Sequence, residues 1–151
     1  MKIYTLIYSQ EIPVDKKKCW QFFSDPRNLQ RITPPEMDFE ILSDLPKNVY
    51  AGQIILYKIK ILPGIKANWT TEITHVKEDE YFVDEQRFGP YKFWHHQHLF
   101  TETADGMKVT DIIHYAIPAG LIGRFMNRLF IRKKLENIFI YRTKFLGSYF
   151  N

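Results

Sequence analysis

The stretch Gly89–Phe100 holds residues whose types and spacing could do chemistry, because three histidines and four aromatic residues fall within twelve positions. If residues 93–100 form a β-strand, successive side chains point to opposite faces. Trp94, His96, His98 and Phe100 then share one face, and His95 lies on the other. Imidazoles framed by large rings are typical of small-molecule pockets, because aromatic surface supplies affinity and a few polar groups fix orientation.

Neighbouring predicted strands add polar and aromatic side chains to the same face. Buried carboxylates and imidazoles are costly unless they pair, so Asp84 or Asp111 beside His96 or His98 would be mutually stabilising. Such a network either satisfies itself as a structural element or orients the polar end of a ligand, and the sequence leaves both open. The predicted cavity residues are Tyr57, Trp69, Asp84, Gln86, Trp94, His96, His98, Phe100, Asp111 and Tyr115.

Two further chemical uses of this set are open. In an enzyme, a His–Asp pair would act as a general base on an acidic C–H group, with Tyr115 or the second histidine stabilising an enolate. The catalytic candidates would be His96, His98, Asp84, Asp111 and Tyr115, but their spacing is no signature and binding is favoured over catalysis. His96-x-His98 also has the strand spacing of a zinc pair, with Asp84 or Asp111 as third ligand. The alternative is a pair of hydrogen-bonded core histidines, and we expect no metal or other cofactor.

The elements that must position these residues follow from hydrophobic periodicity and from breaks at Pro and Gly. A strand over 3–12 is followed by a short helix over 14–24, and by a second helix capped at Asp25 and ended by Pro34-Pro35. Only strands come next, up to a final long helix from Gly120 with a bend expected near Gly123. The predicted strands after the second helix cover 37–42, 52–61, 65–75, 82–86, 93–100 and 110–117, with a hairpin turn at Asp105-Gly106.

Composition restricts the class of protein. The 151 residues are 45% hydrophobic and 16% aromatic, which suits one globular domain spanning 1–151. Cys19 is the only cysteine, which excludes intramolecular disulfides and Cys-based zinc clusters. The apolar run Met1–Tyr8 is too short for a signal peptide, and no run approaches the roughly 18 apolar residues of a membrane span. We therefore expect a soluble, cytoplasmic protein.

The net charge of +4 is concentrated in the final segment, where Gly120–Asn151 carries seven basic residues against the single acid Glu136. Such a strip could face an anionic membrane surface, although a solvated helix face is the commoner explanation. Nucleic-acid binding is disfavoured, because no recognised motif is present. The oligomeric state stays open. The basic residues are Arg124, Arg128, Arg132, Lys133, Lys134, Arg142 and Lys144.

Four motifs carry a resemblance to a known superfamily. They are Trp69, Phe82-x-Asp84-x-Gln86-x-x-Gly89-Pro90, Trp94-x-His96-x-His98-x-Phe100 and Asp111-x-x-x-Tyr115-x-x-Pro118. With this order of elements, the whole chain resembles the SRPBCC or START-like superfamily, which includes birch-pollen-allergen-like proteins, lipid-transfer domains and polyketide cyclases and dehydratases. Within it, the chain is most similar to small bacterial ligand-binding members, some of which are labelled cell division inhibitors.

The resemblance implies an α+β helix-grip fold: a curved antiparallel sheet of about seven strands wrapped around a long C-terminal helix, with two short helices after the first strand. It also implies that a small, largely hydrophobic ligand, such as a lipid, polyketide or aromatic metabolite, binds between sheet and helix. One alternative is a cyclase- or dehydratase-like enzyme that uses the same His/Asp cluster. Another is an interaction protein that acts through its basic C-terminal helix, because one fold hosts many functions.

Overall fold

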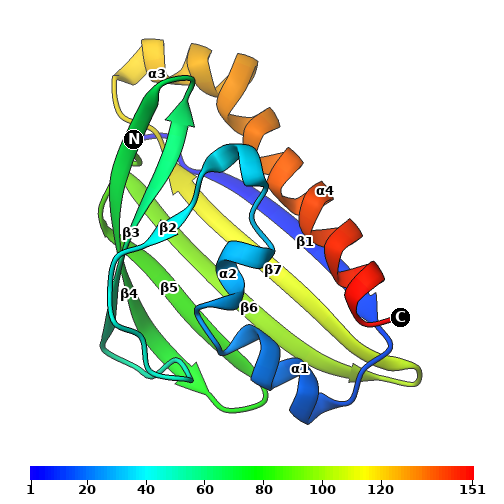
Figure 1. Ribbon diagram of the computed structural model, residues 1–151. Helices are drawn as coiled ribbons and strands as arrows, with labels where there is room; N and C mark the ends of the chain where they lie inside the picture. Colours follow the sequence, from blue (N-terminus) through cyan, green and yellow to red (C-terminus); the bar gives the residue numbers. More distant parts are fainter.

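The computed structural model describes residues 1–151 and contains one antiparallel sheet in the order β1-β7-β6-β5-β4-β3-β2. The first strand lies beside the last strand, with Tyr4 opposite Tyr115, so β1 forms one edge of the sheet (Figure 1). This is the predicted α+β arrangement. The strands are β1 Tyr4–Ile12, β2 Glu40–Ile41, β3 Gln53–Leu62, β4 Ile65–Lys77, β5 Tyr81–Phe88, β6 Phe93–Thr103 and β7 Gly106–Ala116.

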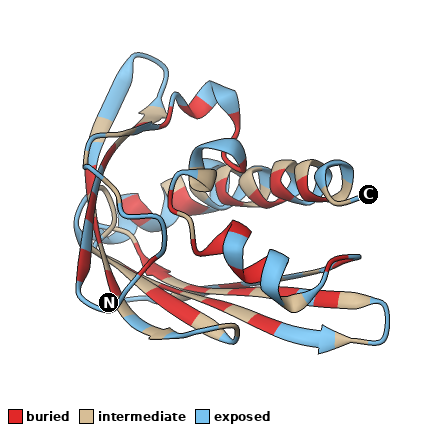
Figure 2. Ribbon diagram, turned by 60° about the horizontal axis from the view of Figure 1, so that its bottom comes forward, coloured by how far each residue is buried: buried red, intermediate tan, exposed pale blue.

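The helices occupy the concave side of the curved sheet, and the buried residues of sheet and helices face one another there (Figure 2). A long helical segment ends the chain, as predicted, and short helices follow β1. The helical elements are α1 Lys16–Phe23, α2 Asn28–Arg31, the 3-10 turn η1 Pro35–Met37, α3 Gly120–Met126, the π-helical turn η2 Asn127–Ile131 and α4 Arg132–Tyr149.

Strand β6 has the alternation that its sequence predicts. Trp94, His96, His98 and Phe100 are buried on the concave face, and the residues between them are only partly buried. His95 lies on the outer face, where its Nδ1 is 2.8 Å from a carboxylate oxygen of Glu85. The period of two therefore determines which histidines reach the interior.

Aromatic pairs join the helices to the sheet. Phe139 of α4 stacks on Tyr8 of β1, with ring centroids 4.2 Å apart. Trp20 of α1 packs edge-on against Phe82 and Phe100 of the sheet. Offset and edge-on pairs of this kind add to the stabilisation from burial alone, by about 0.5–1.5 kcal/mol each.

The hairpin between β6 and β7 requires glycine at position 106. Gly106 has a φ of 146°, which L side chains rarely adopt, and a Cβ there would overlap the backbone oxygen of Ile12. The predicted turn at Asp105-Gly106 is confirmed, and its tip packs tightly against the end of β1.

The connection from α1 to β3 differs from the prediction. The strand expected over 37–42 shrinks to Glu40–Ile41, because Pro34 and Pro35 initiate a 3-10 turn and Asp38 adopts a left-handed conformation with φ of 45°. The second helix is a single turn that starts at Asn28, although Asp25 does accept a hydrogen bond from the Arg27 amide.

The expected bend near Gly123 is absent, and a π-helical turn occurs at Asn127–Ile131 instead. Gly123 allows the close approach of α3 to the preceding loop, since a Cβ there would overlap the backbone oxygen of Pro118. The additional residue in a π turn rotates the helix that follows. The face that α4 turns toward the sheet therefore differs from the face that an uninterrupted α-helix would present.

Candidate functional site

A cavity of about 430 Å³ lies between the concave face of the sheet and the C-terminal helical segment. Hydrophobic side chains provide 26 of its 39 lining residues. The volume falls within the usual range for small-molecule sites, and the mostly apolar lining favours a largely apolar occupant.

The cavity opens between α3, η2 and the hairpin that joins β3 to β4. Ile122, Phe130 and Leu62 line the cavity and are nevertheless exposed, which places them at its mouth. The Nζ of Lys134, near the start of α4, donates to the backbone oxygen of Lys60 at 2.9 Å and so fixes this end of the helix to β3.

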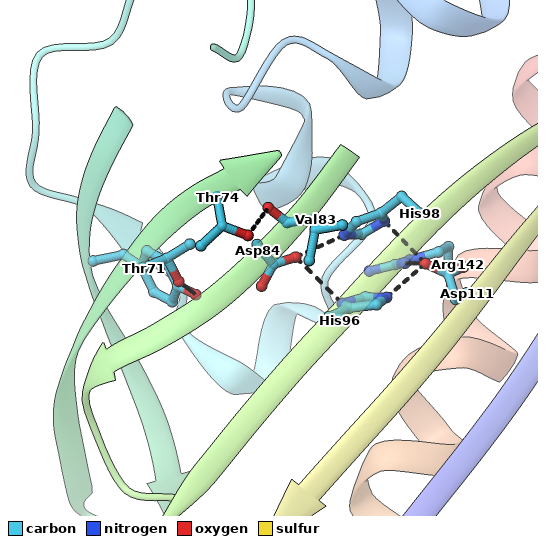
Figure 3. Close-up of polar contacts among 9 residues, drawn as sticks. Thr71, Thr74, Val83, Asp84, His96, His98, Asp111 and Arg142 are labelled. Atoms are coloured by element: carbon cyan, nitrogen blue, oxygen red, sulfur yellow. Dashed lines mark hydrogen bonds and ion pairs between the residues drawn. The ribbon is translucent and has the colours of Figure 1, made fainter. Parts of the chain in front are cut away.

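Asp84, His96, His98 and Asp111 form a crossed network over three adjacent strands (Figure 3). Asp84 is opposite His96 in the sheet, and Asp111 is opposite His98. The short contacts run diagonally instead, with His98 Nε2 2.7 Å from Asp84 Oδ2 and His96 Nε2 2.8 Å from Asp111 Oδ1. The strand register thus brings two imidazoles between two carboxylates.

The second nitrogen of each imidazole faces the other carboxylate. His98 Nδ1 lies 3.0 Å from Asp111 Oδ1, although its direction does not suit a hydrogen bond, and His96 Nδ1 lies 3.5 Å from Asp84 Oδ2. The two rings are 3.8 Å apart between centroids, and His98 stacks on Phe82 at 4.2 Å. Packing on every side therefore restricts the orientation of both rings.

Arg142 of α4 completes the network, which we call the histidine–aspartate cluster: Asp84, His96, His98, Asp111 and Arg142. The Nη1 of Arg142 donates to Asp111 Oδ1 at 3.2 Å, and its guanidinium lies over the ring of Phe139 at 4.7 Å. Arg142 and Asp111 are only 5% and 4% exposed. A buried carboxylate with a buried guanidinium is far less costly than either group alone.

Burial and charge set the protonation of the two carboxylates. Burial acts to raise the pKa of Asp111, but the charge of Arg142 and the close contacts of both histidines outweigh it and hold that pKa well below its usual range. Burial likewise acts to raise the pKa of Asp84, and the interactions with His96 and His98 more than offset it. Both groups are therefore carboxylates at neutral pH.

The two histidines shift in opposite directions. Burial and the neighbouring charge of His98 lower the pKa of His96. Burial also acts to lower the pKa of His98, but its contacts with Asp111 and Asp84 prevail and raise it. One protonated histidine together with Arg142 balances the two carboxylates, so the cluster is neutral when His98 carries the proton.

The structure separates the sequence-predicted residues into two groups. Tyr57, Trp69, Asp84, Trp94, His96 and His98 line the cavity. Gln86, Phe100, Asp111 and Tyr115 are absent from its wall.

Each of these four has another contact. Gln86 is bonded to the backbone of Tyr91 through both its amide atoms, and Phe100 packs among aromatic rings. Asp111 lies behind the histidines, and the Tyr115 hydroxyl donates to Asn127 Oδ1 at 3.0 Å. Tyr115 is thus turned away from any enolate bound in the cavity.

Arg142 is not among the cluster residues predicted from the sequence. The sequence places this residue only among the basic residues of the final segment. A signal was present: Arg142 follows Phe139 by three positions on the apolar stripe that also contains Leu135 and Leu146. A charged residue on a buried stripe requires a buried partner. Arg142 also lines the cavity, and its Nε has no hydrogen-bond partner.

Comparison with known proteins identifies the fold. No protein-family model and no curated protein sequence matches the chain. Solved structures match over nearly its whole length, among them TTHA0849 from Thermus thermophilus, with 13% identity, 96% of this chain and 95% of that chain covered and a TM-score of 0.71.

Two further structures show the same likeness. CV1439 from Chromobacterium violaceum has 13% identity, covers 97% of this chain and 96% of its own, and gives a TM-score of 0.71. The major latex-like protein 151 from Panax ginseng has 14% identity, covers 99% and 98%, and gives 0.70. Together with the sheet order and the final helix, these matches show that the chain has the helix-grip fold.

Proposed function

We propose that the protein binds a small, largely hydrophobic molecule with one hydrogen-bonding end. The observation that carries this proposal is a mostly apolar cavity with the histidine–aspartate cluster in its wall. Apolar lining supplies affinity, and a few fixed polar groups orient the ligand. Superfamily members that hold lipids or polyketides in the corresponding space support this ligand class.

Two unpaired donors point to the chemistry of the polar end. Trp69 Nε1 and Arg142 Nε belong to cavity-lining residues, are buried and have no hydrogen-bond partner. A buried donor without a partner costs about 1–3 kcal/mol. Neither atom is accessible from the cavity as the side chains stand, so a carbonyl or carboxylate oxygen of a ligand would satisfy these donors after a small rotation of the side chains.

The test is a binding titration with cis-parinaric acid, a fluorescent fatty acid, combined with native mass spectrometry of the purified protein. Ile59 lines the cavity, so Ile59→Trp should fill space and weaken binding at least tenfold. Ile54 lies on the same strand, is 47% exposed and does not line the cavity, so Ile54→Trp is the matched control. Equal affinity of wild type and both variants would overturn the proposal.

The same cluster could instead act on the bound molecule. Asp84, His96 and His98 face the cavity and are the groups able to accept a proton from a ligand there. If a candidate substrate is converted, His96→Ala and His98→Ala should abolish turnover while binding persists. A full rate in both variants would exclude catalysis by the cluster.

A second candidate function is peripheral contact with an anionic membrane surface. Large apolar side chains on α3 and η2 are exposed beside the cavity mouth, and Arg124 and Arg128 are interspersed among them. An apolar face flanked by arginines is typical of helices that lie in the interface of anionic bilayers. No helix in the structure is long and apolar enough to cross a bilayer. The exposed apolar residues are Leu121, Ile122, Phe125, Leu129 and Phe130.

Co-sedimentation with phosphatidylglycerol vesicles tests this second candidate. Binding should fall in Phe125→Ser and in Arg124→Ala/Arg128→Ala, and it should weaken with added salt, because the charges are exposed. Phe88→Ser is the matched control, since Phe88 is 75% exposed on β5. Equal sedimentation of all forms would exclude contact through this segment.

A further inference from the structure

Three potential metal ligands converge at the cavity wall. One ligand atom from each of Asp84, His96 and His98 lies within 4.8 Å of the others. Asp84 Oδ2 is 3.5 Å from His96 Nδ1 and 2.7 Å from His98 Nε2. A tetrahedral ion with metal–ligand bonds of about 2.0–2.2 Å separates its ligand atoms by about 3.4 Å. The His96–Asp84 spacing already fits, and the His98–Asp84 spacing needs to open by less than about 1 Å to reach that separation.

The opposite side of both imidazoles is occupied by a carboxylate. His96 Nε2 is 2.8 Å and His98 Nδ1 is 3.0 Å from the same oxygen of Asp111. In protein metal sites, a coordinating histidine usually directs its other ring nitrogen to a carboxylate, which fixes the tautomer. Asp111 therefore occupies the place of such an outer carboxylate for His96, to which it is hydrogen-bonded, and it lies within reach of His98 Nδ1, where a small rotation of the ring would direct the N–H toward it. Arg142 holds Asp111 there.

In this arrangement the lone pairs of three ligand atoms can face one another. If both imidazoles direct an N–H toward Asp111, the lone pairs of His96 Nδ1 and His98 Nε2 face Asp84 Oδ2. Three acceptors cannot remain together in a buried site without a cation between them. A proton can supply that charge, and so can a metal ion.

The opening of the His98–Asp84 contact breaks no other hydrogen bond of the His98 ring. His98 Nδ1 makes no well-directed hydrogen bond, so a small rotation of the ring breaks none there. Asp84, His96 and His98 all line the cavity, so an ion held by them would keep a coordination position open toward a ligand. With a divalent ion, the two carboxylates and Arg142 leave one excess positive charge, which an anionic oxygen of that ligand would neutralise.

We propose that Asp84, His96 and His98 bind one divalent transition-metal ion, with Asp111 and Arg142 as positioning residues. Two histidines and one carboxylate suit zinc and iron(II), and their N/O donor set disfavours calcium and magnesium, which prefer oxygen ligands. This site stands on the geometry of the cluster and does not depend on the hydrophobic ligand.

The experiment is titration of chelator-treated, full-length protein with Zn²⁺ by calorimetry, and with Co²⁺ by visible absorption spectroscopy. We expect one ion per chain and a Co²⁺ spectrum of nitrogen and oxygen ligands. His98→Ala and Asp84→Asn should weaken Zn²⁺ binding at least 100-fold. Asp111→Asn should weaken it about 10- to 100-fold, the range found when an outer-shell carboxylate is removed.

A matched control excludes adventitious binding. His95 and His114 lie on the outer face of the sheet, with ring centroids 6.1 Å apart and Glu85 beside His95. His95→Ala/His114→Ala should bind Zn²⁺ like the wild type. If this variant loses the ion while His98→Ala keeps it, or if the wild type binds no stoichiometric ion, the proposal is wrong.

A third measurement needs no variant and remains decisive if the substituted proteins fail to fold. Nitrogen-15 shifts of the histidine rings in the wild type should show Zn²⁺ bound at His96 Nδ1 and His98 Nε2. Unchanged shifts of both rings at saturating Zn²⁺ would overturn the proposal. Probe binding by the apo protein tests the cavity separately, so a failure of the metal site and a failure of the ligand proposal are distinguishable.

Discussion

Arg142 and Asp111 show at the level of single residues why the cluster is stable in the interior. Each would be an uncompensated charge if the other were absent, since they are 5% and 4% exposed. Their 3.2 Å contact, the Phe139 ring under the guanidinium and the histidine on the other side of the carboxylate satisfy them together. Removal of one charge should therefore cost more than removal of both.

A double-mutant cycle at this pair measures the effect. Arg142→Leu leaves the Asp111 carboxylate buried without its counter-charge, which should lower the free energy of unfolding by about 3–5 kcal/mol. Adding Asp111→Asn to Arg142→Leu should recover at least about 1 kcal/mol, since the buried charge is gone. Urea unfolding of the wild type, both single variants and the double variant gives the coupling energy. Strictly additive losses would contradict the interpretation of the pair as mutually compensating.

Cys19 allows a prediction about pH that is independent of the cluster. Burial, with the negative charge of Asp15 as a smaller contribution, raises the pKa of the Cys19 thiol to about 12. An unfolded thiol has a pKa of about 8.5, so the contribution to stability is complete below that pH and is lost as the pH rises toward 12. Near pH 10 the loss should be about 2 kcal/mol.

The measurement compares urea unfolding of wild type and Cys19→Ala at pH 8 and pH 10, because other groups titrate equally in both proteins. The decrease on going to pH 10 should be larger in the wild type. The thiol should also react with a disulfide reagent only as fast as the protein unfolds. Rapid modification of the native protein at pH 8 would show that Cys19 is accessible.

At the scale of elements, the π turn Asn127–Ile131 determines which face of the last helix meets the sheet. It places the apolar residues of α4, such as Leu135 and Phe139, toward the core, while Leu129 before them remains exposed. It also buries Asn127, which accepts the hydrogen bond of the Tyr115 hydroxyl. A continuous α-helix through the same residues could not both turn Leu135 and Phe139 toward the core and bring Asn127 to the Tyr115 hydroxyl.

Deletion of a single residue tests this role. Removing Leu129, which is exposed within the π turn, should convert the turn to ordinary α-helix and change the melting temperature by only a few degrees, because the flanking segments keep their faces. Removing Asn137, exposed in the regular part of α4, rotates all later residues by about 100°. That rotation carries Leu146 and Arg142 off the core and should unfold the protein. Equal effects of the two deletions in thermal melts would refute this account.

The elements also show what a sequence can and cannot predict. The strand alternation at Trp94–Phe100 depends only on a local period of two, so the inward set, including both cluster histidines, was predictable. The π turn was not, because its extra residue is favoured by tertiary contacts such as Tyr115 to Asn127. Likewise, the contact of Arg142 with Asp111 joins residues 31 positions apart and depends on how α4 crosses the sheet.

The whole molecule leaves a cavity where a close-packed protein would have side chains. An open volume of about 430 Å³ removes contacts that the lining residues would otherwise make. The sheet closes around α4 at one end through Tyr8 and Phe139, while the other end stays open at Ile122 and Phe130. The fold therefore combines a packed end with an accessible end.

Occupation of the cavity should stabilise the entire molecule by mass action. At a ligand concentration about 100 times its Kd, the free energy of unfolding rises by about 2.7 kcal/mol, because the ligand binds the folded state alone. For a chain of this size, that corresponds to a rise in melting temperature of about 5–10 °C. The measurement is a thermal melt of delipidated protein with and without cis-parinaric acid. If its binding is tenfold weaker, Ile59→Trp at the same ligand concentration should gain only about 1.4 kcal/mol, which corresponds to a rise of about 3–6 °C. A rise in this blocked variant as large as in the wild type would mean that the fatty acid stabilises the protein from outside the cavity.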